Sequence, residues 1–218
     1  MKIACLHTHE SNVAGFNAAA AALGLPEDLL LHAVRPDLLA EAERSGGLTL
    51  DVRRSTAEAL LALAASADAV LLTCSTLGLA ADDAAPHASV PILRADAALA
   101  TEAVAAGGKV VALCAVATTM APTTQLFAAA AARTGATVEI RMVEGAWALF
   151  REGRQQDYLA AVAASADAAY RDGAEMVALA QASMAGAAEL VTAGPTPPCS
   201  PLAGLRQAVA AAQSSVRR

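Results

Sequence analysis

A cysteine between hydroxyl side chains ends a short apolar segment in the first half of the chain. Residues 70–78 have the sequence VLLTCSTLG, so Cys74 follows an apolar run and precedes Ser75 and Thr76. If the run is a strand that leads into a helix, the free N–H groups of the helix lower the pKa of the thiol from about 8.5 toward neutrality. Such a thiol could act as a general base or a nucleophile. The alternative is a buried cysteine that packs as a small apolar residue.

Polar residues follow other apolar segments in the same way. Thr118 and Thr119 come after the run KVVALCAVA and shortly before Pro122. They could cap a helix, and their hydroxyls and amides could also hold a substrate carboxylate. Gln181 and Ser183 follow the run MVALA. We expect these two side chains to bind substrate or to orient a water molecule.

Two histidines and a threonine end the first apolar segment, at His7, Thr8 and His9. Alternate residues of a strand share a face, so His7 and His9 could chelate a metal ion. No Asp, Glu or Cys at a suitable spacing completes such a site, and we predict none. Contact of Thr8 or His7 with a ligand is the favoured interpretation. His32 and His87 have the pattern of ordinary, partly exposed residues.

The remaining cysteines are weaker candidates than Cys74 for a catalytic role. Cys5 and Cys114 lie inside apolar runs and are expected to be packed. Cys199 lies in the loop GPTPPCSPLAG near a strand end, where it could supply a second thiol. None of the four cysteines forms a C-x-x-C pair, which argues against a structural zinc site.

Short apolar strands alternate with alanine-rich helices along the chain, a pattern typical of parallel sheets covered by helices. One helix is expected over residues 55–67, with Ser55 as its N-cap. The pattern then restarts: Lys2 and Lys109 both begin strands, 107 positions apart (2 to 109). The same offset relates Pro91 to Pro198 and places Cys74 on Gln181.

The repeat predicts two similar α/β lobes, the first formed by residues 1–97 with 195–218 and the second by residues 98–194. Each lobe is a doubly wound parallel sheet. Open sheets of this kind bind ligands at the carboxyl ends of their strands, so a cleft between the lobes would lie between Cys74 and Gln181. The alternative is one doubly wound sheet of six to eight strands.

The segments TCSTLG, ATTMAPTT and LAQASMAG resemble the aspartate/glutamate racemase superfamily over nearly the whole chain. That superfamily includes hydantoin racemases, maleate isomerases and arylmalonate decarboxylase. The resemblance implies two lobes related by a pseudo-twofold axis, an active site between them and a homodimer. It also implies chemistry without cofactor or metal, in which one cysteine of each lobe exchanges a proton at the carbon next to a carboxylate.

This chain departs from that pattern because Gln181 stands where the second cysteine is expected. An amide cannot exchange a proton as a thiol does. From the resemblance and the strand-end positions together, we expect Cys74 to act as base or nucleophile on a small carboxylate held by Thr8, Ser75, Thr76, Thr118, Thr119, Gln181 and Ser183. Racemisation or isomerisation is the first hypothesis. A one-thiol lyase, decarboxylase or cis–trans isomerase is the alternative, and a non-catalytic carboxylate-binding module is another.

The composition narrows the class of protein further. The chain has 218 residues, a net charge of −6 and few basic pairs, which argues against a nucleic-acid partner. No apolar run of about 18 residues is present, and the N-terminus has no signal-peptide pattern, so we expect a cytoplasmic protein without a membrane partner. Phosphate-loop, dinucleotide-binding and G-x-S-x-G motifs are also missing, which argues against nucleotide binding and serine-hydrolase chemistry.

Overall fold

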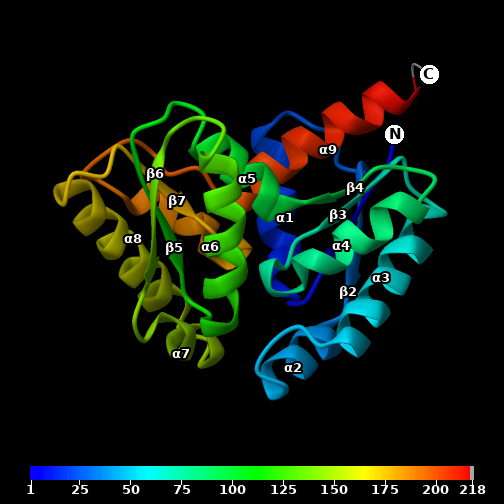
Figure 1. The fold of residues 1–218 in the computed structure, drawn as a ribbon, viewed down its shortest axis with the longest axis horizontal. Coiled ribbons are helices and arrows are strands. Elements are labelled where there is room, and N and C mark those ends of the chain that lie inside the picture. Colours follow the sequence, from blue (N-terminus) through cyan, green and yellow to red (C-terminus); the bar gives the residue numbers. More distant parts are fainter. Residues whose placement is uncertain (217–218) are drawn as a thin grey trace. The chain divides into compact units, whose positions relative to one another are not determined.

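The structure, a computed structural model that describes residues 1–216, contains two compact α/β units. The first comprises Met1–Ala98 and the C-terminal helix from Pro201 onward, and the second comprises Leu99–Ser200. Each unit has its own parallel sheet, of four strands in the first and three in the second (Figure 1). The predicted α/β fold with two parallel-sheet lobes is confirmed, and the alternative of a single large sheet is wrong.

The sheet of the first unit has the strand order β2-β1-β3-β4, with all neighbours parallel. Its strands are β1 (Ile3–His7), β2 (Leu30–Val34), β3 (Ala69–Leu72) and β4 (Ile92–Arg94). The helical segments are α1 (Ser11–Ala22), α2 (Pro36–Arg44), α3 (Leu50–Ala64), η1 (Ser75–Leu77), α4 (Gly78–Ala84), η2 (Ala85–His87) and α9 (Ser200–Val216). The boundary between the two units falls within α5 (Ala95–Ala103).

Alternate residues of β1 and β3 form the cores on the two faces of this sheet. Leu6 and Leu72 pack with apolar residues of α2 and α3. On the other face, the ring of His7 lies 5.1 Å from the ring of Phe16 in α1. Helix α9 also lies against that face, where a Cβ on Gly204 would come within 3.2 Å of a methyl group of Leu71. Glycine at position 204 therefore allows this close approach.

The sheet of the second unit has the order β6-β5-β7 and is also parallel. Its elements are β5 (Lys109–Cys114), α6 (Ala117–Ala131), β6 (Thr137–Met142), α7 (Ala146–Arg151), α8 (Gln155–Arg171), β7 (Met176–Leu179) and η3 (Ala182–Leu190). Helix α6 covers one face of the sheet and α8 the other (Figure 1). The predicted last strand at Pro198 is reduced to a single bridge between Cys199 and Leu179.

Matching hydrogen bonds show that the second unit repeats the first. The backbone N–H of Lys2 donates to the carboxylate of Asp68 at 2.6 Å, and that of Lys109 donates to Glu175 at 3.0 Å. These four residues obey the predicted offset of 107. The repeat weakens at the last strand, where Pro91 accepts from Val70 but Pro198 accepts from Leu179, two positions further along.

Two helix starts differ from the sequence-based expectation. Helix α3 begins at Leu50, because the hydroxyl of Thr49 caps it by accepting from the N–H of Val52 at 3.4 Å. Ser55 therefore lies inside the helix and is not its N-cap. Helix α6 begins at Ala117 with Val116 as N-cap, so Thr118 and Thr119 are helical residues of its first turn rather than caps.

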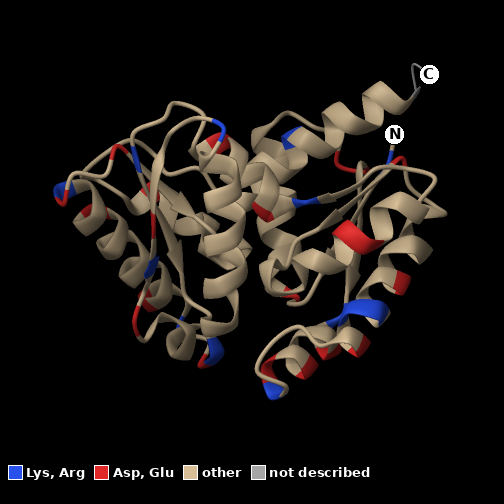
Figure 2. Cartoon of the chain, viewed as in Figure 1, with Lys and Arg blue, Asp and Glu red and all other residues tan. Residues whose placement is uncertain are grey.

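Charged residues are scattered over both units (Figure 2). Many of the arginines lie beside a carboxylate, as Arg53 does beside Asp83 and Arg141 beside Asp172. Among the described residues, no helix has the length and apolar character needed to cross a membrane.

Candidate functional site

Cys74 lies just after β3, where the strand gives way to the short helix η1. The preceding residue, Thr73, still pairs with β1 through its N–H, which donates to the carbonyl of Leu6 at 3.1 Å. Cys74 keeps an extended backbone (φ −109°, ψ 114°), and its carbonyl accepts from the N–H of Leu77 at 3.2 Å. The thiol is half-buried at the carboxyl end of a parallel strand, as predicted from the sequence.

The pKa of Cys74 is raised, not lowered. Burial is the largest cause, since it disfavours the thiolate, and the negative charge of Asp96 adds a smaller effect in the same direction. A hydrogen bond from Thr8 and the N–H groups of Leu77 and Thr76 act in the opposite direction. The expected effect of the helix amides is therefore present but smaller than the cost of burial.

Three of the predicted binding residues surround Cys74. Leu6 pairs with Leu72, so the residues two positions later, Thr8 and Cys74, lie side by side at the carboxyl ends of these two central strands. Thr8 is buried and hydrogen-bonds to the thiol. Ser75 and Thr76 are buried within η1.

Gln181 occupies the position of Cys74 in the second unit. It follows β7 with an extended backbone (φ −120°, ψ 141°), and its carbonyl accepts from the N–H of Met184 at 3.0 Å. Its side-chain oxygen turns back to the end of β5 and accepts from the N–H groups of Ala115 and Val116, the latter at 3.2 Å. The amide oxygen therefore accepts from two backbone N–H groups that could otherwise bind an anion.

The other predicted residues of the second unit lie near this turn or along η3. Thr119 is buried, and its hydroxyl donates to the carbonyl of Val116 at 2.7 Å. Thr118, its neighbour in the first turn of α6, is half-buried. Ser183 lies in η3, where its hydroxyl is 2.7 Å from that of Tyr158. The predicted residues thus form two groups, one in each unit.

Asn12 and Tyr158 are candidate site residues that sequence reasoning missed. The side-chain oxygen of Asn12 is buried and has no hydrogen-bond partner among the described residues. Such an unsatisfied acceptor requires an explanation, and a bound ligand is one. The offset of 107 relates Asn12 to Thr119, so the repeat contained the signal. Tyr158 is fully buried, and burial raises its pKa to about 12, against the smaller opposing effect of its bond to Ser183.

The two histidines near the end of β1 lie in different surroundings. His9 is exposed, with its Nδ1 atom 3.1 Å from the hydroxyl of Ser11. His7 is fully buried and hydrogen-bonded to Thr73 and His32. Burial is the main reason that its pKa is lowered to about 3, and the charge of His32 adds to the effect. His7 and His9 thus do not form a chelating pair.

The structure also places the three remaining cysteines. Cys5 and Cys114 are fully buried in strands, which confirms the expectation that they are packed. Cys199 is buried, with 4% of its surface exposed, and it bridges to β7.

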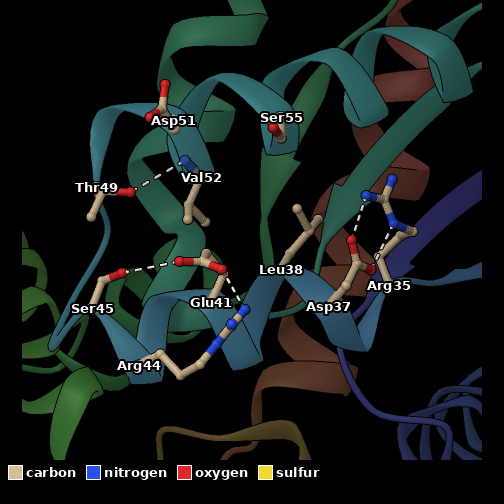
Figure 3. A pocket seen from close by; sticks show the side chains of 10 residues that line it. All are labelled: Arg35, Asp37, Leu38, Glu41, Arg44, Ser45, Thr49, Asp51, Val52 and Ser55. Atoms are coloured by element: carbon tan, nitrogen blue, oxygen red, sulfur yellow. Dashed lines mark hydrogen bonds and ion pairs between the residues drawn. The ribbon is translucent and has the colours of Figure 1, made fainter.

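A groove of about 510 Å³ lies between α2 and α3, away from the predicted site residues (Figure 3). Its charged side chains already bind one another, since Arg35 pairs with Asp37 and Arg44 with Glu41. The groove therefore offers little unpaired charge to a ligand.

Comparison with known proteins identifies the family. The family model for Asp/Glu/hydantoin racemases matches residues 7–211. No curated protein matches the chain. Among solved structures, an aspartate racemase homologue from Pyrococcus horikoshii is 17% identical, with a TM-score of 0.68, and the match covers 97% of this chain and 99% of that one. Allantoin racemase from Pseudomonas fluorescens is 20% identical, with a TM-score of 0.67 and coverages of 100% and 91%.

Arylmalonate decarboxylase is also similar, at 16% identity and a TM-score of 0.59, with coverages of 97% and 92%. At these low sequence identities, the solved structures show a similarity of fold only. The family model spans nearly the whole sequence, from the end of β1 into α9. The chain therefore belongs to the Asp/Glu/hydantoin racemase family.

Proposed function

We propose that the protein is a cofactor-independent enzyme that acts on the carbon next to the carboxylate of a small substrate, with Cys74 as its base. The observation that supports this most directly is the setting of the thiol. It is half-buried at a strand end, bonded to Thr8 and approached by the N–H groups of Thr76 and Leu77. These donors favour the thiolate, which is the form a base requires.

In the proposed step, the Cys74 thiolate takes the α-proton, so that an S–H bond forms and the C–H bond breaks. The electron pair moves into the carboxylate, which becomes an enediolate. Hydroxyl and N–H donors of Ser75 and Thr76, beside Cys74 in the same unit, hold the charge, because preorganised donors stabilise developing negative charge. Burial raises the pKa of the free thiol, so substrate binding must occur with the small thiolate fraction or promote its formation.

Gln181 favours a one-thiol reaction over two-thiol racemisation. A carboxamide is neither a proton donor nor a base near neutral pH, and here its oxygen is held by two backbone N–H groups. One thiol can exchange the α-proton on one face, or protonate the carbanion left by decarboxylation. A one-thiol lyase, decarboxylase or cis–trans isomerase is therefore the second candidate function, and binding of a small carboxylate without catalysis is the third.

The test is proton exchange in D₂O. The protein is incubated with amino acids, hydantoins, 2-aryl acids and malonates, and the α-proton is followed by NMR while chirality and CO₂ release are measured. Wild type is compared with Cys74→Ser and with the matched control Cys114→Ala, which removes a fully buried strand thiol.

We expect exchange with wild type and Cys114→Ala but not with Cys74→Ser. Exchange without inversion supports the one-thiol reaction, whereas full racemisation means that another group supplies the second proton. Exchange that survives in Cys74→Ser would refute the role of Cys74. If no substrate exchanges, isomerises or loses CO₂, the proposal of an enzyme fails and carboxylate binding is the function to measure.

A further inference from the structure

A thiol and two imidazoles meet on the face of the first sheet that packs against α1. Cys5 and His7 alternate on β1, and the strand register places His32 of β2 opposite Cys5. The Cys5 sulfur and one ring nitrogen of each histidine all lie within 4.8 Å of one another. Cys5 and His7 are fully buried, and His32 is half-buried.

The hydrogen bonds around these rings admit two tautomers of His7. The hydroxyl of Thr73 lies 3.0 Å from the carbonyl of Leu6 and 2.9 Å from Nδ1 of His7, and it can donate to only one of them. On the outer side, Nε2 of His32 lies 2.9 Å from the side-chain oxygen of Asn17, which is an acceptor only, so this nitrogen carries a proton. When Thr73 donates to Leu6, Nδ1 of His7 also carries a proton and donates to Thr73.

In that tautomer two lone pairs face each other, because Nε2 of His7 and Nδ1 of His32 are 2.9 Å apart. In the other tautomer, Nε2–H of His7 donates to Nδ1 of His32. A metal ion selects the first tautomer, in which both nitrogens can bind it, and the thiol of Cys5 supplies a balancing negative charge once it is deprotonated.

We propose that Cys5, His7 and His32 bind one thiophilic metal ion, with Cu⁺ preferred to Zn²⁺. The ligands are the Cys5 thiolate, Nε2 of His7 and Nδ1 of His32. Metal–ligand bonds of about 2.0–2.3 Å place ligand atoms roughly 3.3–4 Å apart, so the two rings need to separate only slightly. Binding releases the thiol proton to water and involves no redox step.

The preference for Cu⁺ follows from charge and ligand type. One thiolate and two neutral imidazoles form a neutral group with Cu⁺, whereas Zn²⁺ leaves a net positive charge among buried residues, which is costly. Thiolate ligands also select Cu⁺, and one thiolate with two imidazoles is a known copper-binding set.

The partners of the outward-facing nitrogens complete this pattern. Histidines that bind metals usually donate their other N–H to an oxygen, which fixes the ring. Thr73 and Asn17 supply those oxygens here. In the first unit Cys5 pairs with His32 across two strands, and in the second unit the equivalent pair is Ala112 and Ile140. The second unit therefore lacks this ligand set.

The test is a metal titration in a Cys74→Ser background, which removes the half-buried thiol and makes the result independent of the proposed catalytic role. Cu⁺ is supplied anaerobically as its bicinchoninate complex, and Zn²⁺ is titrated in parallel against a colorimetric chelator. The variants Cys5→Ala, His32→Gln and Asn17→Leu are compared with the matched control Cys114→Ala. Far-UV circular dichroism verifies that each variant is folded.

We expect one equivalent of Cu⁺ in the background protein and in Cys114→Ala. Loss of Cys5 or His32 should abolish competition with the chelator, and Asn17→Leu should weaken binding by about 10- to 100-fold. Failure of the background protein to bind either ion, or equal binding by Cys5→Ala, would overturn the site. Tighter binding of Zn²⁺ than of Cu⁺ would overturn the charge argument behind the choice of ion.

Discussion

The ends of β3 and β7 share one backbone design and carry different chemistry. In each unit an extended residue follows the strand and its carbonyl accepts from the N–H three positions later, at 3.2 Å for Cys74 and 3.0 Å for Gln181. Beside Cys74, the segment after the neighbouring strand β1 supplies Thr8, whose hydroxyl bonds to the thiol, whereas the equivalent residue beside Gln181 is Ala115.

The difference explains what each end can do. Alanine has no hydroxyl to bond to the side chain at this position, and the side-chain oxygen of Gln181 instead accepts from the N–H groups of Ala115 and Val116. In the first unit the side chain at this position is a titratable thiol with donors around it. The first unit therefore carries a titratable thiol at this position and the second an amide whose oxygen accepts from two backbone N–H groups, and each prediction below alters one side of this comparison.

The largest expected effect is that of Cys74→Ser. A hydroxyl has a far higher pKa than a thiol, so loss of the base should lower the rate of α-proton exchange by about 10²- to 10⁴-fold. Exchange into D₂O is measured by NMR on the best substrate of the panel. Gln181→Ala serves as the comparison, and a loss as large as that of Cys74→Ser would mean that the second unit also takes part in proton transfer.

The sequence predicted the positions in this comparison better than their environment. The offset of 107 placed Cys74 on Gln181, and each of them follows the corresponding strand with an extended backbone. It did not anticipate the raised pKa of Cys74, because burial depends on packing that spacing does not encode. The pairing of His7 with His32 was also missed, since it crosses between strands 25 residues apart.

Local chemistry accounts for the other misses. Ser55 has the side chain of a cap, but Thr49 comes earlier in the sequence and caps α3 instead. Strand β6 was not predicted, because Glu139 and Arg141 interrupt its apolar character. In the structure these two side chains pair at 2.9 Å on the half-buried edge strand.

The next effect concerns stability in the second unit. Gln181→Ala leaves the N–H groups of Ala115 and Val116 without their acceptor. A buried donor that neither protein nor water satisfies costs about 1–3 kcal/mol. We expect a lower free energy of unfolding, by about 1–3 kcal/mol in total if water reaches one donor. Urea unfolding measures it.

Gln181→Glu is the matched variant, because it keeps an acceptor oxygen and adds charge. Hydrogen bonds to the carboxylate lower its folded-state pKa, so the variant should be as stable as wild type at neutral pH and lose that stability as the pH falls through the lowered pKa. Equal destabilisation by alanine and glutamate at neutral pH would mean that the two N–H groups do not need this acceptor.

A smaller effect is expected from Thr8→Val, which keeps the shape of the side chain and removes its hydroxyl. The hydrogen bond from Thr8 lowers the pKa of Cys74, so its loss should raise that pKa and reduce the thiolate fraction. Alkylation by iodoacetamide near neutral pH should therefore slow, because only the thiolate reacts. Thr119→Val, which removes a buried hydroxyl from the second unit, is the control and should leave this rate unchanged.

The smallest effect is expected from Asp96→Asn. The charge of Asp96 raises the pKa of Cys74 and is the least of the causes, so its removal should lower the pKa and speed alkylation a few-fold. Asp96 also binds the buried guanidinium of Arg94 at 2.9 Å, and the variant is therefore less stable. Asp82→Asn separates the two effects, because Asp82 binds the same arginine at 2.8 Å from a more exposed position. Faster alkylation in both variants would assign the change to a loosened Arg94, whereas faster alkylation in Asp96→Asn alone assigns it to the charge of Asp96.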